Sequence, residues 1–88
     1  MNIYKKITVI IVSFNSSKKI EKCLSNIDTR YKKIVIENTR DLNLKKKIER
    51  KFNNSKVILN SNKGFGAANN LGVKIAKTKY VLITSPDV

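Results

Sequence analysis

The chain has 88 residues, enough for one domain with a small core. Its 19 lysines and arginines against six acidic residues give a net charge of +13, and it contains one cysteine and no histidine. An internal disulfide and any histidine-based triad, metal ligand or proton shuttle are therefore excluded. The one cysteine, Cys23, falls in a helical pattern and is interpreted as a small core residue.

No apolar run reaches the roughly 18–20 residues that cross a bilayer. The run 7–14 is too short, and the polar segment 15–19 after it lacks the small-residue cleavage site of a signal peptide. We therefore expect a cytoplasmic chain. The lysines form a solvated face or bring the chain to the anionic inner face of a membrane as a peripheral protein. Nucleic-acid binding is a third, less favoured reading, because no aromatic and basic residues interleave.

Apolar blocks and helical patterns alternate along the chain. Residues 7–13 form a β-branched run typical of a strand covered on both faces. Residues 15–17 can cap a helix, and a second strand is expected at 33–37, followed by a polar turn at 38–41. The apolar positions of this first helix fall at helical spacing: Ile20, Cys23, Leu24 and Ile27.

Residues 42–52 predict a lysine-rich second helix, 53–55 end it, and 56–59 form the third strand. A third helix is expected at 67–76 and a fourth strand at 80–84. Gly72 inside this helix costs about 1 kcal/mol relative to alanine, which a close approach of helix to strand would justify. The expected core positions of these helices are Leu44, Ile48, Phe52, Ala68, Leu71, Gly72, Ile75 and Ala76.

This alternation predicts an α/β fold with a Rossmann-like parallel sheet of four strands in the order 3-2-1-4. Right-handed crossovers place the three helices on both faces of the sheet. The order reverses between strands 1 and 4, and ligands of such sheets bind outside the carboxyl ends of the strands at that reversal.

Polar and acidic residues follow the strands at that expected edge. Strand 1 ends in Ser13, Phe14 and Asn15, strand 2 in Glu37, and strand 4 is followed by Ser85 and Asp87. Two of only six acidic residues, Glu37 and Asp87, thus share one rim of a basic chain. The pattern indicates a site where carboxylate oxygens bind a divalent metal ion.

Asp87 follows Pro86, which tends to end the strand and to direct the carboxylate out of the sheet. Mg²⁺ and Mn²⁺ take one or two carboxylates together with substrate phosphates. On spacing alone, a turn aspartate after a strand is the favoured reading of Asp87. Glu37 can accept a hydrogen bond from a base or ribose, or it is a solvated residue at the end of a strand.

The loop 62–66 carries two glycines before the third helix. Gly64, Phe65 and Gly66 can bring backbone N–H groups to a diphosphate at the start of that helix, and Lys63 can add a cation. A plain tight turn and a surface lysine are the open alternatives.

Three segments together resemble the amino-terminal half of family 2 glycosyltransferases with the GT-A fold, over nearly the whole chain from Thr8 to Val88. Segment 9–15 (V-I-I-V-S-F-N) resembles the family's first strand and nucleotide loop. Segment 62–72 (N-K-G-F-G-A-A-N-N-L-G) resembles its N-x-G-[FY]-[GA]-x-[AG]-N-N-x-G segment. Segment 85–88 (S-P-D-V) resembles the N-P-D-[VA] variant of its metal motif, common in rhamnosyltransferase-like members.

The resemblance implies sugar transfer from a nucleotide diphosphate donor, usually UDP- or dTDP-sugar, with Mg²⁺ or Mn²⁺, in cell-surface polysaccharide synthesis. It implies that Ser13 and Asn15 lie against the base, that Glu37 takes the place of a base-contacting aspartate, and that Asp87 ligates the metal. The donor-binding residues implied in full are Ser13, Phe14, Asn15, Glu37, Lys63, Gly64, Phe65, Gly66 and Ser85.

The chain departs from the family pattern at two residues and in extent. Glu37 stands where aspartate is usual, and Ser85 replaces asparagine. The family's acceptor half and catalytic base follow the metal motif, so no residue is assigned as the base. We expect residues 1–88 to be one truncated nucleotide-binding domain, whose glycan or lipid-linked acceptor needs the missing half. A non-catalytic interaction module, with self-association through an open edge strand, and a nucleic-acid binder are the alternatives.

Overall fold

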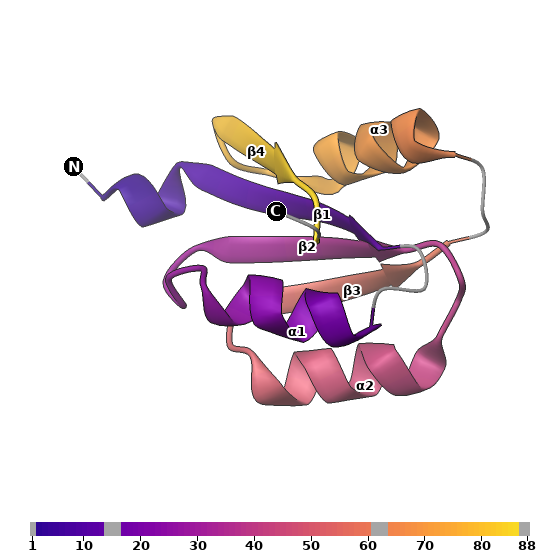
Figure 1. The fold of residues 1–88 in the computed structure, drawn as a ribbon. Coiled ribbons are helices and arrows are strands. Elements are labelled where there is room, and N and C mark those ends of the chain that lie inside the picture. Colours follow the sequence, from indigo (N-terminus) through magenta and orange to yellow (C-terminus); the bar gives the residue numbers. More distant parts are fainter. Residues whose placement is uncertain (1, 14–16, 61–63, 87–88) are drawn as a thin grey trace.

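The computed structural model describes residues 2–13, 17–60 and 64–86. A short 3₁₀ helix, η1, precedes four strands and three helices that alternate along the chain (Figure 1). Their bounds are η1 Ile3–Lys5, β1 Ile7–Ser13, α1 Ser17–Ser25, β2 Lys32–Glu37, α2 Leu42–Lys51, β3 Ser55–Leu59, α3 Phe65–Ile75 and β4 Tyr80–Thr84.

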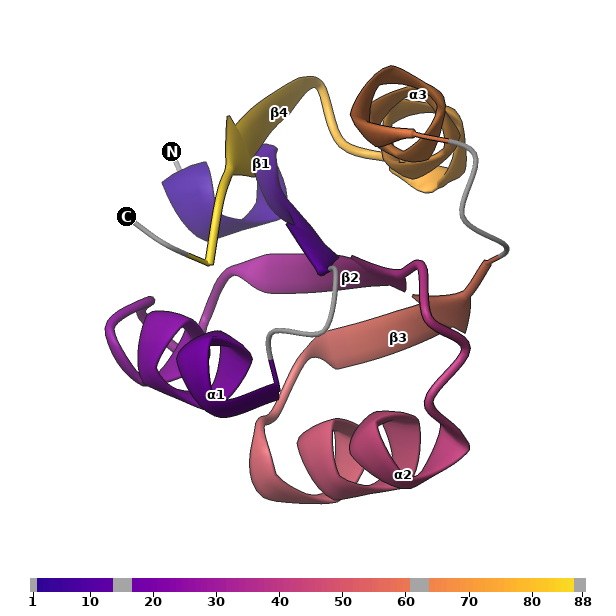
Figure 2. The ribbon, with the colours of Figure 1, turned by 45° about the vertical axis from the view of Figure 1, so that its right-hand side comes forward.

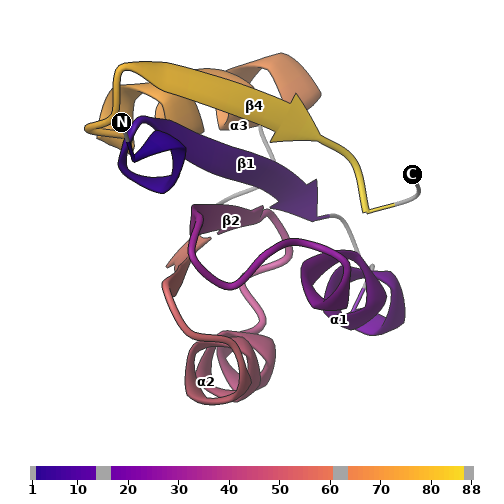
Figure 3. The same cartoon turned by 90° about the vertical axis from the view of Figure 1, so that its left-hand side faces the viewer.

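The four strands form one parallel sheet in the order β3-β2-β1-β4. β1 lies between β2 and β4, and Figure 3 shows β1 and β4 side by side with their arrowheads in the same direction. The predicted α/β class and strand order are therefore confirmed. The reversal of strand order lies between β1 and β4, as expected.

The helices cover both faces of the sheet. Figure 2 shows α1 and α2 on one face and α3 on the other. Two separate apolar clusters result. The first lies under α1 and α2 and the second under α3, and the buried members of the first are Val9, Ile11, Ile20, Cys23, Leu24, Val35, Leu44, Ile48 and Val57. Those of the second are Ile10, Val12, Ile34, Ile36 and Ala68. The alternation of β1 between the two clusters explains its unbroken apolar run.

Several element boundaries differ from the sequence expectation by one or two residues. β2 begins at Lys32 rather than at 33, α2 ends at Lys51 rather than at 52, and α3 ends at Ile75 rather than at 76. α1 ends at Ser25, so Ile27 lies beyond the helix in which it was expected.

Two further differences have a clear cause in the backbone. α3 begins at Phe65 rather than at residue 67, because Gly64 adopts a φ of 93° and turns the chain directly into the helix. β3 begins at Ser55, within the segment expected to break the structure. Asn54 supplies the turn there with a φ of 61°, and its carbonyl accepts the Lys33 N–H at 2.8 Å. The parallel ladder therefore starts at Ser55, one residue before the expected start of the strand.

Gly72 allows α3 to approach β1 closely. A Cβ at this position would lie 2.6 Å from Cγ2 of Ile10, nearer than any packed methyl group can sit. The expected reason for a glycine inside the helix is thus confirmed.

The two outer strands of the sheet, β3 and β4, differ in how their outward-facing backbone groups are bonded. At β3, the Val57 N–H donates to Glu49 of α2 at 2.9 Å, and Lys45 of α2 donates to the Val57 carbonyl oxygen at 2.6 Å. Lys45 and Glu49 also form an ion pair at 3.0 Å. Two helix side chains therefore occupy both outer backbone groups of Val57, in the middle of this edge strand.

At the other edge, β4 is uncovered among the described residues. Four consecutive apolar side chains are exposed along it, and Tyr80 and Leu82 keep 56% and 57% of their surface in solvent. The other two are Val81 and Ile83. Such a continuous apolar edge is unusual on a soluble monomer.

Candidate functional site

The carboxyl ends of the strands meet at one edge of the sheet. Ser13, the last residue of β1, is in register with Glu37 of β2, and Glu37 is in register with Leu59 of β3. β4 ends at Thr84, in register with Ile11. The carboxyl ends of all four strands therefore lie at the same edge of the sheet, as the predicted strand order requires.

Hydrogen bonds extend the ladder beyond the strand ends. The Asn38 N–H donates to the Ser13 carbonyl oxygen at 3.0 Å, and the Asn60 N–H donates to the Glu37 carbonyl oxygen at 2.9 Å. The Asn60 side-chain amide also donates to Oδ1 of Asn38 at 3.1 Å. This network fixes the turns after β2 and β3 against each other.

Glu37 is buried, with 1% of its surface exposed, so it is no solvated strand-end residue. Its carboxylate accepts the Thr39 hydroxyl at 2.6 Å and the Thr39 N–H at 3.3 Å. A carboxylate offers about four acceptor positions. Each oxygen of Glu37 therefore keeps acceptor capacity for a further donor. Whether a base contacts it stays a prediction.

Two buried polar atoms at this edge lack a hydrogen-bond partner among the described residues: Oγ of Ser13 and Nδ2 of Asn38. Ser13 is fully buried and Asn38 is 2% exposed. A buried polar atom without a partner costs about 1–3 kcal/mol. Such atoms are rare in folded proteins and call for a specific explanation, such as a ligand that satisfies them.

The start of α3 reaches the same edge, because α3 follows β3 after a short connection (Figure 1). Gly64 is the N-cap and offers no side chain to the first helical N–H groups. A Cβ on Gly66 would meet no atom within 4 Å, so packing does not require glycine there. The start of a helix favours an anionic group through its first backbone N–H groups and the helix dipole.

Five of the predicted site residues cannot be placed by their side chains. Phe14, Asn15, Lys63 and Asp87 lie outside the described residues, and Phe65 is placed only as the first residue of α3. Ser85 is half-buried directly after β4. No group of three acidic, cysteine or histidine residues gathers within the described ranges, and the predicted role of Asp87 as a metal ligand stays a prediction.

Asn38 and Asn60 are site residues that sequence reasoning missed. Asn38 directly follows the last residue of β2, and Asn60 directly follows the last residue of β3. An asparagine at the equivalent position after two neighbouring strands is the signal that could have identified them. Asp41, also in the turn after β2, caps α2 by accepting the Leu44 N–H at 3.0 Å and is structural.

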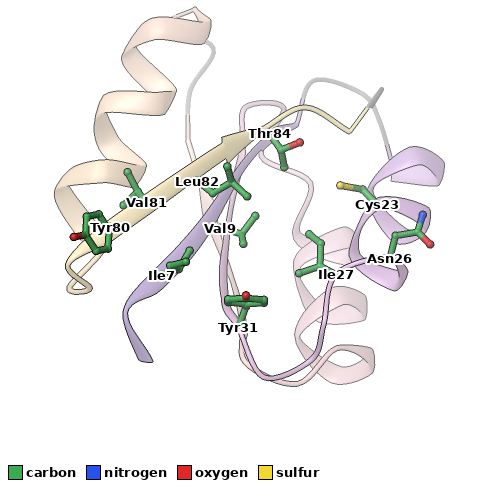
Figure 4. Close-up of a pocket in the computed structure, with 10 residues that line it drawn as sticks. All are labelled: Ile7, Val9, Cys23, Asn26, Ile27, Tyr31, Tyr80, Val81, Leu82 and Thr84. Carbon is green, nitrogen blue, oxygen red and sulfur yellow. The ribbon is translucent and has the colours of Figure 1, made fainter. Parts of the chain in front are cut away.

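A separate hollow of about 430 Å³ lies between α1 and the β1–β4 pair, away from this polar network. Figure 4 shows Cys23, Asn26 and Ile27 lining one side and Tyr80, Leu82 and Thr84 the other. Burial raises the pKa of the Cys23 thiol, which keeps it protonated and inert. The described residues that line the hollow are uncharged, and most of them are apolar.

Comparisons with known proteins bear on this geometry. The chain resembles the crystal structure of S. aureus TarS 1-349 with a TM-score of 0.68 and 22% sequence identity, over 93% of this chain and 27% of that structure. The similarity supports the fold alone, and the chain spans about a quarter of that protein. No curated protein matches the sequence. None of the helices in the described ranges is long and apolar enough to cross a membrane.

The sequence model of the family described as glycosyl transferase family 2 matches residues 8–88, almost the whole chain. The matched region includes all four strands and the polar carboxyl edge described above. The chain belongs to glycosyltransferase family 2.

Proposed function

We propose that this chain is the donor-binding part of a family 2 glycosyltransferase and binds a UDP- or dTDP-sugar at the carboxyl edge of its sheet. The observation that carries the proposal is the pair of buried atoms without a partner, Oγ of Ser13 and Nδ2 of Asn38. They lie on neighbouring strands, joined by the hydrogen bond from Asn38 N–H to the Ser13 carbonyl.

The chemistry of these two groups fits the edge of a pyrimidine. A hydroxyl donates and accepts, and an amide nitrogen donates. Uracil and thymine both present carbonyl acceptors beside a ring N–H, so UDP and dTDP satisfy the same pair of groups. Because both atoms are buried, hydrogen bonds to them form at low local dielectric and discriminate strongly between bases.

The diphosphate would lie between the start of α3 and the end of β4. The uncapped N–H groups after Gly64 favour an anion there. Asp87, with Ser85 beside it, would hold Mg²⁺ or Mn²⁺ against the phosphates. One carboxylate completed by phosphates and waters is an ordinary ligand set for such an ion. The bound ion would neutralise charge on the leaving diphosphate.

Transfer itself needs an acceptor hydroxyl and a general base. We propose that a glycan or lipid-linked acceptor is bound by protein outside the region that these residues form. The transfer would take place in cell-surface polysaccharide synthesis. A rhamnosyltransferase-like specificity is the subtype that the S-P-D-V segment favours. The positive charge would allow peripheral contact with an anionic membrane surface.

Isothermal titration of the 88-residue chain with UDP and dTDP, each with Mg²⁺ or with a chelator, tests this function. We expect metal-dependent binding, weakened about 5- to 10-fold by Ser13→Ala, which removes one buried hydrogen bond. Asp87→Ala should abolish the metal dependence and spare the fold. Asp28→Ala removes a carboxylate before the start of β2, at the amino ends of the strands, and should bind as the wild type does.

The proposal would be overturned if titration with millimolar nucleotide gave no heat of binding while circular dichroism showed that the chain is folded. Equal binding by the wild type and Asp87→Ala would make Asp87 a turn residue only. Binding of nucleic acid that weakens with salt, without nucleotide binding, would favour the alternative reading of the basic charge.

A further inference from the structure

The amino edge of the sheet, where the four strands begin, concentrates positive charge. Because the strands are parallel, the segments that enter them lie together, at the left of Figure 1. Their one acidic residue, Asp28, is already paired with Arg30, with 2.7 Å between Oδ2 and Nη2. Two, three, one and two cations respectively occur in the four segments, which are 5–6, 28–33, 54–56 and 77–79. The positive charge of this edge is therefore not balanced within it.

A groove of about 420 Å³ lies at this amino edge, between the end of α3 and the first residues of β1, β2 and β3. Its volume falls within the range of ligand pockets, about 300–1,000 Å³. The register of the sheet places the lining side chains on the face that α3 covers. Thr8 is paired with Lys32, and Ile34, a member of the apolar cluster under α3, is paired with Lys56.

Three exposed lysines from separate segments border the groove: Lys32, Lys56 and Lys77. None of the ion pairs found among the described residues involves them. The described lining contains no acidic residue, and Ile34 and Ile75 supply its apolar part. The groove thus combines three cations with apolar surface, a combination that fits an anionic group attached to an apolar body.

We propose that this groove binds the phosphate group of an anionic lipid, so that the amino edge of the sheet docks on a membrane surface. Clusters of about 4–8 lysines and arginines bind anionic lipids, and each such residue near the surface strengthens binding roughly 5-fold. The proposal assigns a particular surface, and hence an orientation, to the membrane contact that the net charge suggests.

The aromatic residues of this edge favour a membrane over nucleic acid. Single-stranded nucleic acid is bound by aromatic rings whose faces are free to stack on bases. Tyr4 and Tyr31 pack edge to face with 4.7 Å between their ring centres, and the Arg30 guanidinium lies 4.0 Å from the centre of the Tyr4 ring. No aromatic residue lines the groove within the described ranges. Tyrosines beside cations suit the headgroup region of a bilayer.

Docking through the amino edge turns the candidate donor site away from the bilayer. β1 has seven residues, so the two edges of the sheet are about 20 Å apart, beyond the screening length of about 8 Å at physiological salt. Glu37 and Asp41 lie at the far edge, where their negative charge does not oppose docking. The inference does not depend on nucleotide binding, because the groove and the polar network occupy opposite edges.

Cosedimentation of the 88-residue chain with lipid vesicles tests this surface. We expect binding to vesicles of equal parts phosphatidylcholine and phosphatidylglycerol, and none to pure phosphatidylcholine. Lys32→Gln, Lys56→Gln and Lys77→Gln combined should weaken binding roughly 100-fold, since each lysine contributes roughly 5-fold. Raising the salt from about 0.1 M to about 1 M should release the wild-type chain.

The matched control removes the same charge at the carboxyl edge, by combining Lys18→Gln, Lys19→Gln and Arg40→Gln. The two lysines lie in the first turn of α1, and Arg40 lies between β2 and α2. Because these cations are more than a screening length from the docked edge, binding should stay within about 3-fold of the wild type. Circular dichroism should show that both combined variants are folded.

Absence of binding to the anionic vesicles by the folded wild type would overturn the proposal. Equal losses in the two combined variants would overturn the groove as the docking surface. Inorganic phosphate should displace the chain no better than sodium chloride of the same ionic strength, and stronger displacement would assign the groove to a soluble phosphate compound instead. Binding of single-stranded DNA without vesicle binding would assign the charge to nucleic acid.

Lys77→Gln alone separates docking from a structural role at the end of α3, where a cation also favours the helix dipole. We expect roughly 5-fold weaker vesicle binding. A lower melting temperature with unchanged vesicle binding would show that Lys77 only stabilises the helix, and would overturn its place in the groove.

Discussion

Glu49 of α2 accepts the Val57 N–H of β3 at 2.9 Å, so a helix carboxylate replaces a fifth strand at this edge of the sheet. Lys45 completes the arrangement from one turn earlier in the helix. The carboxylate therefore has a structural role whose strength depends on its charge.

The pH dependence of stability tests this role of Glu49. Burial alone would raise its pKa, but the hydrogen bonds from Val57 and Lys45 outweigh burial and lower the pKa below its ordinary value of 4.5. The folded state then binds fewer protons than the unfolded state, so the stabilisation is full above about 4.5 and is lost as the pH falls through the lowered pKa.

Glu49→Gln should therefore reduce the free energy of unfolding by about 1 kcal/mol near neutral pH, since the group is partly exposed. The difference between variant and wild type should shrink as the pH falls below 4.5 and through the lowered pKa of Glu49. Urea unfolding at several pH values measures it. A difference that is constant with pH would show that the charge of Glu49 is not involved.

The contact between Gly72 and Ile10 predicts a substitution with an unusual sign. Alanine stabilises an exposed helix interior by about 1 kcal/mol relative to glycine. At position 72 the added Cβ would lie 2.6 Å from Ile10, so Gly72→Ala should instead destabilise by about 1–3 kcal/mol. Gly66→Ala, where the Cβ meets open space, should leave stability unchanged or raise it.

A double-mutant cycle with Ile10→Ala isolates this contact. If the clash is the cause, Gly72→Ala should cost much less in the Ile10→Ala background, with a coupling energy of about 1 kcal/mol or more. Additive effects in thermal unfolding would contradict the steric explanation.

Lys33 is buried in β2 with 1% of its surface exposed, and its ammonium group donates to the Thr29 carbonyl oxygen at 3.4 Å. Removal from water lowers the pKa of Lys33 below 10.5, although the charge of Asp28 opposes the shift. Lys33→Met keeps the length of the side chain and removes the charge. We expect it to stabilise the fold by about 1 kcal/mol at neutral pH.

The gain from Lys33→Met should shrink as the pH rises through the lowered pKa toward 10.5, because the wild-type lysine then loses its proton and its cost. Lys32→Met, at the exposed neighbouring position, should change stability by less than about 0.5 kcal/mol. Equal effects of the two substitutions in denaturant unfolding would show that burial of Lys33 carries no penalty.

The buried carboxylate of Glu37 depends on Thr39 for both of its observed hydrogen bonds. Thr39→Val removes the hydroxyl and should destabilise the fold by about 1–2 kcal/mol, because a buried charged acceptor loses a donor. Thr39→Ser keeps the hydroxyl and should cost less. If both variants unfold at the wild-type denaturant concentration, the 2.6 Å contact contributes nothing to stability.

Most of the fold could be predicted from the sequence because local pattern and tertiary environment agree. The β-branched run of β1 is covered on both faces, and the spacing of Leu44 and Ile48 matches their burial under the sheet. Boundaries were less accurate where single backbone conformations decide them. The positive φ of Gly64 places the start of α3 before the expected residue 67. The positive φ of Asn54 allows β3 to begin at the polar residue Ser55.

The candidate site was predictable in position and less so in detail. The strand order alone places Ser13 and Glu37 at one edge. The burial of Glu37 and the hydrogen bonds that it accepts from Thr39 could not be predicted. The sequence left Glu37 as a solvated strand end or a base contact, and it placed Thr39 in an ordinary polar turn. The amide network of Asn38 and Asn60 depends on the register of neighbouring strands, which no local pattern encodes.

The parallel connection between β1 and β4 also constrains the order of folding. Ile7 pairs with Tyr80, so β1 and β4 meet only after the residues between them have been made. Closing so long a loop is entropically costly, and contacts of this separation slow folding. During translation β1 can pair with β2 before β4 has emerged from the ribosome. A nascent chain halted before Tyr80 would leave one side of β1 unpaired and accessible to chaperones.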